Sequence, residues 1–385
     1  MDKKTWLKKN AMLIVLILVF AFFVILTKGG MFSPSSFSEL INQNAYVYIL
    51  GTGMLMCMLT GGNIDLSVGS FVCLLCAFGG VFLTIKKMGV AVSILSMLGI
   101  GVLYGVILGF LIAYIRIPPW IATLAGYLAF RGLGTAILLN NSATGSLQFP
   151  NAFNRIFYGR IFATEPGKLN VPCLLFGFIA AAAVIVLSLL NRRARVKKGY
   201  EVNSMRSTLL KAVAEGAVII LLMSKLSMDG GIPTTLLWVI GVLAIYSFIT
   251  EKTTIGRHFY VVGGNSEAAR LSGIDTRRVM FLAYLNMAVL TTVAAMTVVG
   301  RSQAAYADLG KNFEMDAISA CVVGGVSTSG GAGTVLGMVL GATLIGVINL
   351  GMSLISLDAN WQRIIKGVVL LAAVVFDILS KRREK

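Results

Sequence analysis

The sequence predicts an all-α, polytopic integral membrane protein with about twelve transmembrane helices. Three observations predict this fold class: 57% of the 385 residues are hydrophobic, only 13% are charged, and long apolar runs recur along the chain. Soluble domains carry about 25% charged residues, so the charge here is too low for a water-facing surface. The composition therefore excludes a soluble enzyme. We expect the whole chain, 1–385, to form one transmembrane domain in the lipid bilayer.

The elements follow from the apolar runs, because a helix needs roughly 20 such residues to cross a bilayer. The first run, 11–27, follows four lysines and lacks an A-x-A-like cleavage site, so we interpret it as a retained span and not a signal peptide. Two later runs are weaker, since 212–226 contains two charged residues and 316–329 is short enough for a half-helix or re-entrant segment. After the first run, the expected spans are 45–60, 67–85, 92–115, 119–139, 172–190, 212–226, 233–250, 279–300, 316–329, 333–356 and 363–380.

The distribution of Lys and Arg predicts that both termini lie inside the cell (N-in, C-in). Cytoplasmic loops of membrane proteins are enriched in basic residues, and the chain has 33 Lys and Arg against 16 Asp and Glu. With the N-terminus inside, the basic stretches 191–211, 251–278 and 381–385 are cytoplasmic. Lys86 and Lys87 then lie outside, against the rule. Because membrane topology explains the excess of positive charge, no nucleic-acid partner is expected.

Metal, cofactor and enzymatic chemistry have little support. The five cysteines lie in or beside apolar runs, and the chain has one histidine, whereas a zinc site needs about four ligands. We find no G-x-x-x-x-G-K-[ST] phosphate loop, no G-x-S-x-G elbow and no H-E-x-x-H motif. We therefore expect no metal and no cofactor bound by this chain, and any ATP must be used by another subunit.

A polar, Gly-rich segment at 60–70 interrupts the hydropathy between two expected spans. It contains Asp65 and Ser67. A carboxylate near membrane depth is costly and suggests a functional site. Asp65 can alternatively cap the next helix, because the amides at a helix N-terminus favour an acceptor or anion. Both a structural cap and a contact with substrate remain open.

The cytoplasmic loop 251–278 has the pattern of a short capped helix. Asn265 or Ser266 can cap its start, Glu267 suits its first turn, and Gly273 can end it. A short helix on the cytoplasmic face is suited to docking into a groove of a partner. A surface loop without a partner is the alternative interpretation.

A third polar segment, 312–333, places Glu314 and Asp316 at the outer end of a short span. A stretch rich in Ser, Thr and Gly follows, including Ser327 and Ser329. Irregular backbone at membrane depth must be buried in protein or line a water-filled cavity. The segment is thus a candidate for part of a polar solute path, with close helix packing as the alternative.

Two basic residues inside expected spans need partners in the membrane. These are Arg131 and Lys366, and the acidic candidates to pair with them are Asp65 and Asp316. The sequence does not show which pairs form.

Taken together, the three polar segments resemble the permease subunits of bacterial ATP-binding-cassette sugar importers of the ribose, galactose and xylose type. The shared motifs are I-D-L-S-V-G-S at Ile64–Ser70, G-R-x-x-Y-x-x-G-G-N-x-x-A-A-x-x-S-G-I at Gly256–Ile274, the stretch Glu314–Thr334, and N-x-W-Q-x-x-I-K-G at Asn360–Gly367. The additional basic loop and apolar run at 191–232 resemble the xylose or multiple-monosaccharide subgroup.

The resemblance implies a multi-pass permease of the bacterial plasma (inner) membrane that imports a monosaccharide such as xylose, galactose, glucose or arabinose. It implies a second permease copy (a homodimer), a cassette ATPase that uses ATP and Mg, and an extracytoplasmic sugar-binding protein. The implied ATPase-coupling residues are Gly256, Arg257, Gly263, Gly264, Asn265, Glu267, Ala268, Ala269, Arg270 and Gly273. The candidates for the translocation path are Asp65, Ser67, Arg131, Glu314, Asp316, Ser327 and Ser329.

Two other functions are compatible with a membrane domain. An ion-coupled secondary transporter of a small polar solute would bind its ion at Asp65, Glu215, Glu314 or Asp316. A membrane-embedded enzyme would need a nucleophile and base, and no such set is evident.

Overall fold

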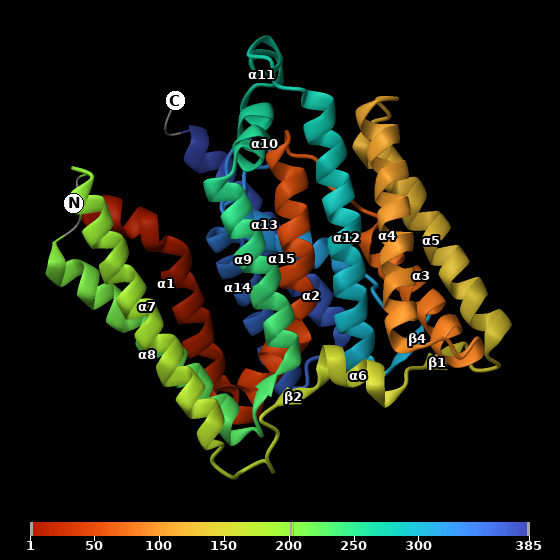
Figure 1. The fold of residues 1–385 in the computed structure, drawn as a ribbon, viewed down its shortest axis with the longest axis horizontal. Helices are drawn as coiled ribbons and strands as arrows, with labels where there is room; N and C mark the ends of the chain where they lie inside the picture. The colour runs from red at the N-terminus through yellow and green to blue at the C-terminus, as the bar shows by residue number, and fades with distance from the viewer. Residues whose placement is uncertain (1–2, 201, 203, 383–385) are drawn as a thin grey trace.

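The chain folds into a bundle of long helices that run side by side across the molecule (Figure 1). This computed structural model describes residues 3–200, 202 and 204–382. Each predicted apolar run coincides with a helix in that part of the chain. These helices are α1 (Lys3–Leu26), α2 (Pro34–Leu59), α3 (Val68–Gly80), α4 (Val90–Ala113), α5 (Pro119–Asn141), α7 (Val171–Lys197), α8 (Met205–Met228), α9 (Thr234–Lys252), α12 (Thr276–Ser302), α13 (Phe313–Val323), α14 (Val335–Leu354) and α15 (Ala359–Arg382).

Seven helices of the described residues are long and apolar enough to cross a membrane. They are α3 with its extension, α4, α5, α7, α9, α12 and α14. This confirms the prediction of an all-α polytopic membrane protein.

Short elements close both ends of the bundle. Those at the lower end of Figure 1 include two antiparallel pairs, β1 with β4 and β2 with β3. Leu147 lies opposite Ala305 in the first pair, and helix α6 buries Phe153 and Phe157 against the bundle. The short elements are η1 (Gly30–Phe32), η2 (Val81–Ile85), β1 (Ser146–Gln148), α6 (Asn151–Tyr158), β2 (Arg160–Ile161), β3 (Ile232–Pro233), α10 (Thr254–Gly264), α11 (Ser266–Leu271) and β4 (Ala304–Tyr306).

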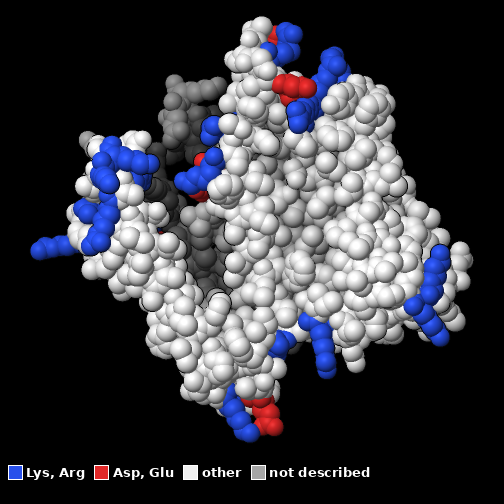
Figure 2. Space-filling view, in the orientation of Figure 1, with Lys and Arg blue, Asp and Glu red and all other residues white. Residues whose placement is uncertain are grey.

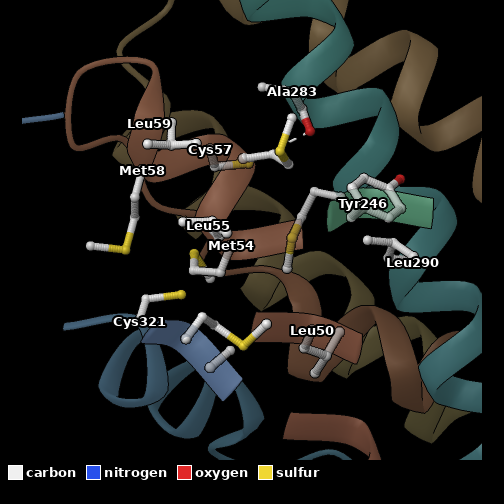
Figure 3. Packing of buried hydrophobic residues seen from close by; sticks show 14 of the residues in the cluster. Leu50, Met54, Leu55, Cys57, Met58, Leu59, Tyr246, Ala283, Leu290 and Cys321 are labelled. Carbon is white, nitrogen blue, oxygen red and sulfur yellow. Dashed lines mark hydrogen bonds between the residues drawn. The ribbon is translucent and has the colours of Figure 1, made fainter. Parts of the chain in front are cut away.

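Helix α2 is the centre of the bundle and packs against α9, α12, α13 and α14. Its side chains from Leu50 to Leu59 are fully buried, and Figure 3 shows several of them meeting Tyr246, Leu290 and Cys321. The Cys57 thiol donates a hydrogen bond to the carbonyl of Ala283. Because α2 is buried among other helices, its polar side chains near the start, such as Ser38 and Asn44, lie within the protein.

The tenth predicted span is neither a full helix nor a re-entrant loop. The chain enters from the lower end at β4, continues without helix through 307–312, and forms α13 only from Phe313 onward. At about 1.5 Å per residue, the 11 residues of α13 cover about half of the roughly 30 Å hydrocarbon layer. The loop 324–334 then lies at the upper end, so this segment is a broken span.

Both chain ends lie toward the upper part of the bundle with α10 and α11 (Figure 1). The predicted cytoplasmic stretch 191–211 connects the upper ends of α7 and α8. Lys86 and Lys87 lie at the opposite end, after η2. Residues 383–385 of the predicted basic C-terminal stretch lie outside the described residues. The stretches that the predicted topology assigns to opposite sides of the membrane therefore lie at opposite ends of the bundle.

Candidate functional site

The short helix α11 begins and ends where the sequence predicted. Asn265 is its N-cap, and its side-chain oxygen accepts a hydrogen bond from the Ala268 amide at 3.0 Å. Gly273 has φ +81°, a left-handed conformation that glycine adopts without strain, and it lets the chain leave the helix. Asp275 then caps α12 by accepting a bond from the Arg278 amide at 3.1 Å. These local caps fix the helix at the upper surface.

The outer face of α11 carries a charged pair and one large apolar side chain. Arg270 donates two hydrogen bonds, of 2.6 and 3.2 Å, to Glu267, and this contact lowers the pKa of the Glu267 carboxyl below its usual value. Ala269 is buried against the bundle, whereas Ala268 is exposed. Leu271 is 77% exposed at the end of the helix. Sequence reasoning missed Leu271, although an apolar residue ending a capped surface helix is a recognisable signal.

The C-terminal end of α10 contacts two other loops backbone to backbone. A Cβ added to Gly263 would lie 1.7 Å from the carbonyl oxygen of Leu59, and one added to Gly62 would lie 1.9 Å from that of Thr328. The Gly331 amide donates to the same Leu59 carbonyl at 3.1 Å. We call these five residues the glycine junction. It joins α10, the α2–α3 loop and the α13–α14 loop with no room for a side chain between them.

The α13–α14 loop is further tied to α10 by a side chain. The Tyr260 hydroxyl donates a hydrogen bond of 3.0 Å to the Gly333 carbonyl. Within the loop, the Ser327 amide donates to the Ala332 carbonyl at 2.8 Å, and the Ser329 amide donates to the Ser327 hydroxyl oxygen at 3.2 Å. The structure thus places Ser327 and Ser329 at the upper end of the bundle, away from the acidic residues of α13.

Asp316 is the centre of a buried polar cluster that joins three helices. It accepts hydrogen bonds from Lys366 of α15, at 2.9 and 3.2 Å, and from the Tyr46 hydroxyl of α2 at 2.5 Å. The Tyr46 ring stacks on Phe313 with ring centroids 3.7 Å apart. Of the two acidic candidates that the sequence left open for Lys366, the structure shows Asp316 as its partner.

Glu314 and Asp316 lie at the entry to a short helical segment, in the first turn of α13, directly after the turns of 307–312. Glu314 is buried, and its Oε2 atom has no hydrogen-bond partner among the described residues. A Cβ added to Gly69 at the start of α3 would lie 2.3 Å from this oxygen.

Arg131 holds the non-helical half of the broken span. Its guanidinium donates hydrogen bonds to the carbonyls of Ala307 at 2.8 Å and Leu309 at 2.9 Å. The expected acidic partner, Asp65 or Asp316, is therefore wrong for Arg131. The physical reason is that the turns of 307–312 do not pair every backbone carbonyl as a helix would, and buried carbonyls must be satisfied within the protein.

Asp65 lies buried in the turn before α3, two residues ahead of the N-cap residue Ser67. Its Oδ1 atom accepts hydrogen bonds from the Ser67 amide at 2.8 Å and the Ser67 hydroxyl at 2.6 Å, while that hydroxyl lies 2.7 Å from the Tyr104 hydroxyl. Asp65 therefore holds the turn that leads into α3 through Ser67 and does not itself cap the helix. The structure places the candidate path residues in three groups: Asp65 and Ser67 before α3, Glu314 and Asp316 at the start of α13 with Arg131 nearby, and Ser327 and Ser329 in the upper α13–α14 loop.

The similarity to known proteins extends along most of the chain. Residues 36–374 match the family described as branched-chain amino acid transport system / permease component. The chain is 34% identical to the xylose transport system permease protein of Haemophilus influenzae, over 99% of both chains. It is 27% identical to the galactose/methyl galactoside import permease of that organism, over 98% of this chain and 96% of the relative.

The ribose import permease protein of Escherichia coli is 27% identical over 97% of this chain and 95% of its own length. No solved structure matches the chain at a significant level. The matched region contains the broken span and the α10–α11 surface together, so the similarity covers the whole candidate site. The chain belongs to the branched-chain amino acid transport system / permease component family and is a multi-pass membrane transport subunit.

Proposed function

We propose that this chain is the permease of an ATP-binding-cassette importer that moves a monosaccharide, of which xylose is the first candidate, into the cytoplasm. The observation that carries the proposal is the 34% identity to a xylose permease over 99% of both chains. A second xylose permease, from Escherichia coli, is 31% identical, above the 27% of the galactose and ribose permeases. The family description names branched-chain amino acids, but these full-length relatives are all named for sugars.

The proposed topology has twelve crossings, with both termini in the cytoplasm of a bacterial cell and the protein in the inner membrane. Its support is that the termini, the basic stretch 191–211 and α10–α11 lie at one end of the molecule. The broken span counts as one crossing because it enters at β4 and leaves at the upper loop. In this proposal the chain 1–385 works as one permease domain, and α8, within the stretch 191–232, is the subgroup-type addition.

The proposed partners are a second permease copy, a cassette ATPase on α10 and α11, and an extracytoplasmic sugar-binding protein. ATP and Mg would be used by the ATPase, and this chain would bind no cofactor. The capped, exposed α11 supports the inner docking site, and the α6 and β-strand layer at the opposite end supplies the surface for the binding protein.

The glycine junction gives a route from the ATPase to the sugar path. Movement of α10 would displace the α13–α14 loop, because Gly263 packs against the Gly331 amide and the Tyr260 hydroxyl is hydrogen-bonded to the loop. The loop continues from α13, which carries Asp316 and Glu314 at half depth. We propose that the path for sugar runs beside this broken span, since irregular backbone at membrane depth suits a polar cavity.

The test is uptake of radiolabelled xylose by proteoliposomes, with galactose and ribose as comparison sugars. We expect concentrative uptake only when the cassette ATPase, the binding protein and internal ATP accompany this chain. Accumulation by the chain alone under a proton or sodium gradient would contradict the proposal and favour the ion-coupled alternative, for which the comparisons offer no support.

Leu271 tests the docking surface separately. Leu271→Asp removes an apolar side chain whose burial stabilises a contact by about 1.5–3 kcal/mol, so we expect the ATPase to bind roughly 10- to 100-fold more weakly. Leu271→Met should retain binding, and Ser272→Asp controls for the added charge. Equal binding by wild type and Leu271→Asp would show that α11 is not the docking element.

A further inference from the structure

The upper ends of α7 and α8 carry a dense group of basic residues that the proposed transport function does not use. Figure 2 shows Lys and Arg side chains crowded over this end of the two helices. Glu201 lies outside the described residues, and Glu215 lines the cavity described next. The basic residues between 191 and 211 are Arg192, Arg193, Arg195, Lys197, Lys198, Arg206 and Lys211.

A polar cavity of about 480 Å³ opens between the two helices at this end. Arg192, Arg195 and Lys211 line it, together with the hydroxyl-bearing residues Ser207 and Thr208. The cavity also faces the first turns of α8, where the helix dipole adds favourable potential for an anion. The opposing charge is limited to Glu215, whose carboxylate lies 3.8 Å from the Lys211 ammonium. The chemistry of the cavity is thus that of a site for a phosphate-like anion.

A second hollow of about 180 Å³ lies beside the first and is mainly apolar. Leu189, Leu190 and Met205 line it, and Arg192 lines both hollows. Leu190 is 51% exposed on the lipid-facing side of α7. A free phosphate ion would use only the polar hollow, whereas a phospholipid needs a polar pocket next to an apolar surface.

We infer that the α7–α8 cavity binds the headgroup phosphate of an anionic phospholipid from the adjacent leaflet, with the start of an acyl chain in the neighbouring apolar hollow. Arginine and lysine recognise phosphate through charge-assisted hydrogen bonds, and basic pockets between transmembrane helices are suited to anionic headgroups. The lipid would also stabilise the position of the α7–α8 helical hairpin. Helix α7 packs almost wholly on α8, and α8 contacts the bundle mainly through α2.

The test uses the full chain purified in neutral detergent and titrated with phosphatidylglycerol, with binding read by native mass spectrometry and by the shift in thermal unfolding. The variant combines Arg195→Gln with Lys211→Gln, both exposed positions where folding should be unaffected. At about 1 kcal/mol per basic residue near an anionic lipid, two residues correspond to roughly 30-fold weaker binding. The matched control combines Lys197→Gln with Lys198→Gln, which removes the same charge outside the cavity and should change affinity by less than about 3-fold.

Three outcomes would overturn the inference. Equal losses in the variant and its control would assign the effect to general surface charge. Equal affinity for phosphatidylcholine would remove the requirement for an anionic headgroup. Competition by glycerol phosphate or inorganic phosphate at the concentration of the lipid would identify a site for a free anion. Preferential, cavity-dependent binding of phosphatidylglycerol supports the inference.

Discussion

At the scale of single residues, the contact between Asp316 and Lys366 is the main electrostatic feature inside the bundle. Side-chain exposure is 6% for Asp316 and 28% for Lys366, so neither charge is well solvated. Charges at membrane depth are expensive unless they are paired. The Tyr46 hydroxyl adds a third group to the pair. The cluster therefore connects α2, α13 and α15, and it fixes the first turn of the half-helix.

Removal of one charge should destabilise the protein more than removal of both. We expect Asp316→Asn or Lys366→Gln alone to lower the free energy of unfolding by about 2–4 kcal/mol, because the remaining charge is left without its partner. The double variant should recover part of this loss. Thermal unfolding in detergent measures the effect. As a control, Asp308→Asn breaks the exposed contact with Lys311 and should cost no more than about 1 kcal/mol. Additive losses in the double variant would contradict the pairing argument.

At the scale of elements, the broken span is built from three kinds of contact. β4 pairs with β1 at the lower end, the Arg131 guanidinium satisfies two carbonyls above it, and Gly310 packs on α3 with its oxygen 2.2 Å from where a Cβ of Gly69 would lie. Each contact replaces a hydrogen bond or packing surface that a continuous helix would supply. The segment can thus keep its non-helical turns inside the bundle, beside the proposed path.

The glycine junction offers two neighbouring positions for a matched comparison. Gly263→Ala places a methyl group 1.7 Å from the Leu59 carbonyl, so the backbone must shift, at a cost of about 1–3 kcal/mol. Gly264→Ala meets no atom within 4 Å and should be structurally silent. In reconstituted complexes we expect Gly263→Ala to reduce sugar uptake per ATP hydrolysed. Although the family resemblance implied a coupling role for Gly264 as well, its open surroundings lead us to expect that Gly264→Ala keeps normal uptake. Normal coupling in a folded Gly263→Ala protein would rule out the junction as the route of transmission.

At the scale of the whole molecule, the fold separates two ends of different character. The upper end carries the termini, α10–α11 and the basic hairpin end, whereas the lower end is closed by α6 and the strand pairs (Figures 1 and 2). Such a separation is what a permease needs to meet an ATPase on one side and a soluble binding protein on the other.

The native cysteines make this orientation directly measurable. All five are free and buried, so a membrane-impermeant thiol reagent should react slowly with the unmodified protein. Ser272→Cys introduces an exposed thiol beside α11, and Ala143→Cys introduces one at the opposite end, between α5 and β1. In spheroplasts, which have lost the outer membrane and cell wall, we expect labelling of Ala143→Cys only. In inside-out vesicles, labelling should switch to Ser272→Cys. The reverse pattern would invert the proposed topology.

The sequence by itself determined the features that depend on neighbouring residues. Hydropathy is local, so every predicted run became a helix, and capping is local, so Asn265 and Gly273 bound α11 as predicted. Tertiary structure alone decided which distant groups meet. Lys366 meets Asp316, whereas Arg131 meets backbone carbonyls, because only the folded bundle shows that 307–312 forms turns whose carbonyls need donors. The burial of Asp316 and the exposure of Leu271 were also decided by packing between segments that lie far apart in the sequence. No local sequence pattern records such packing.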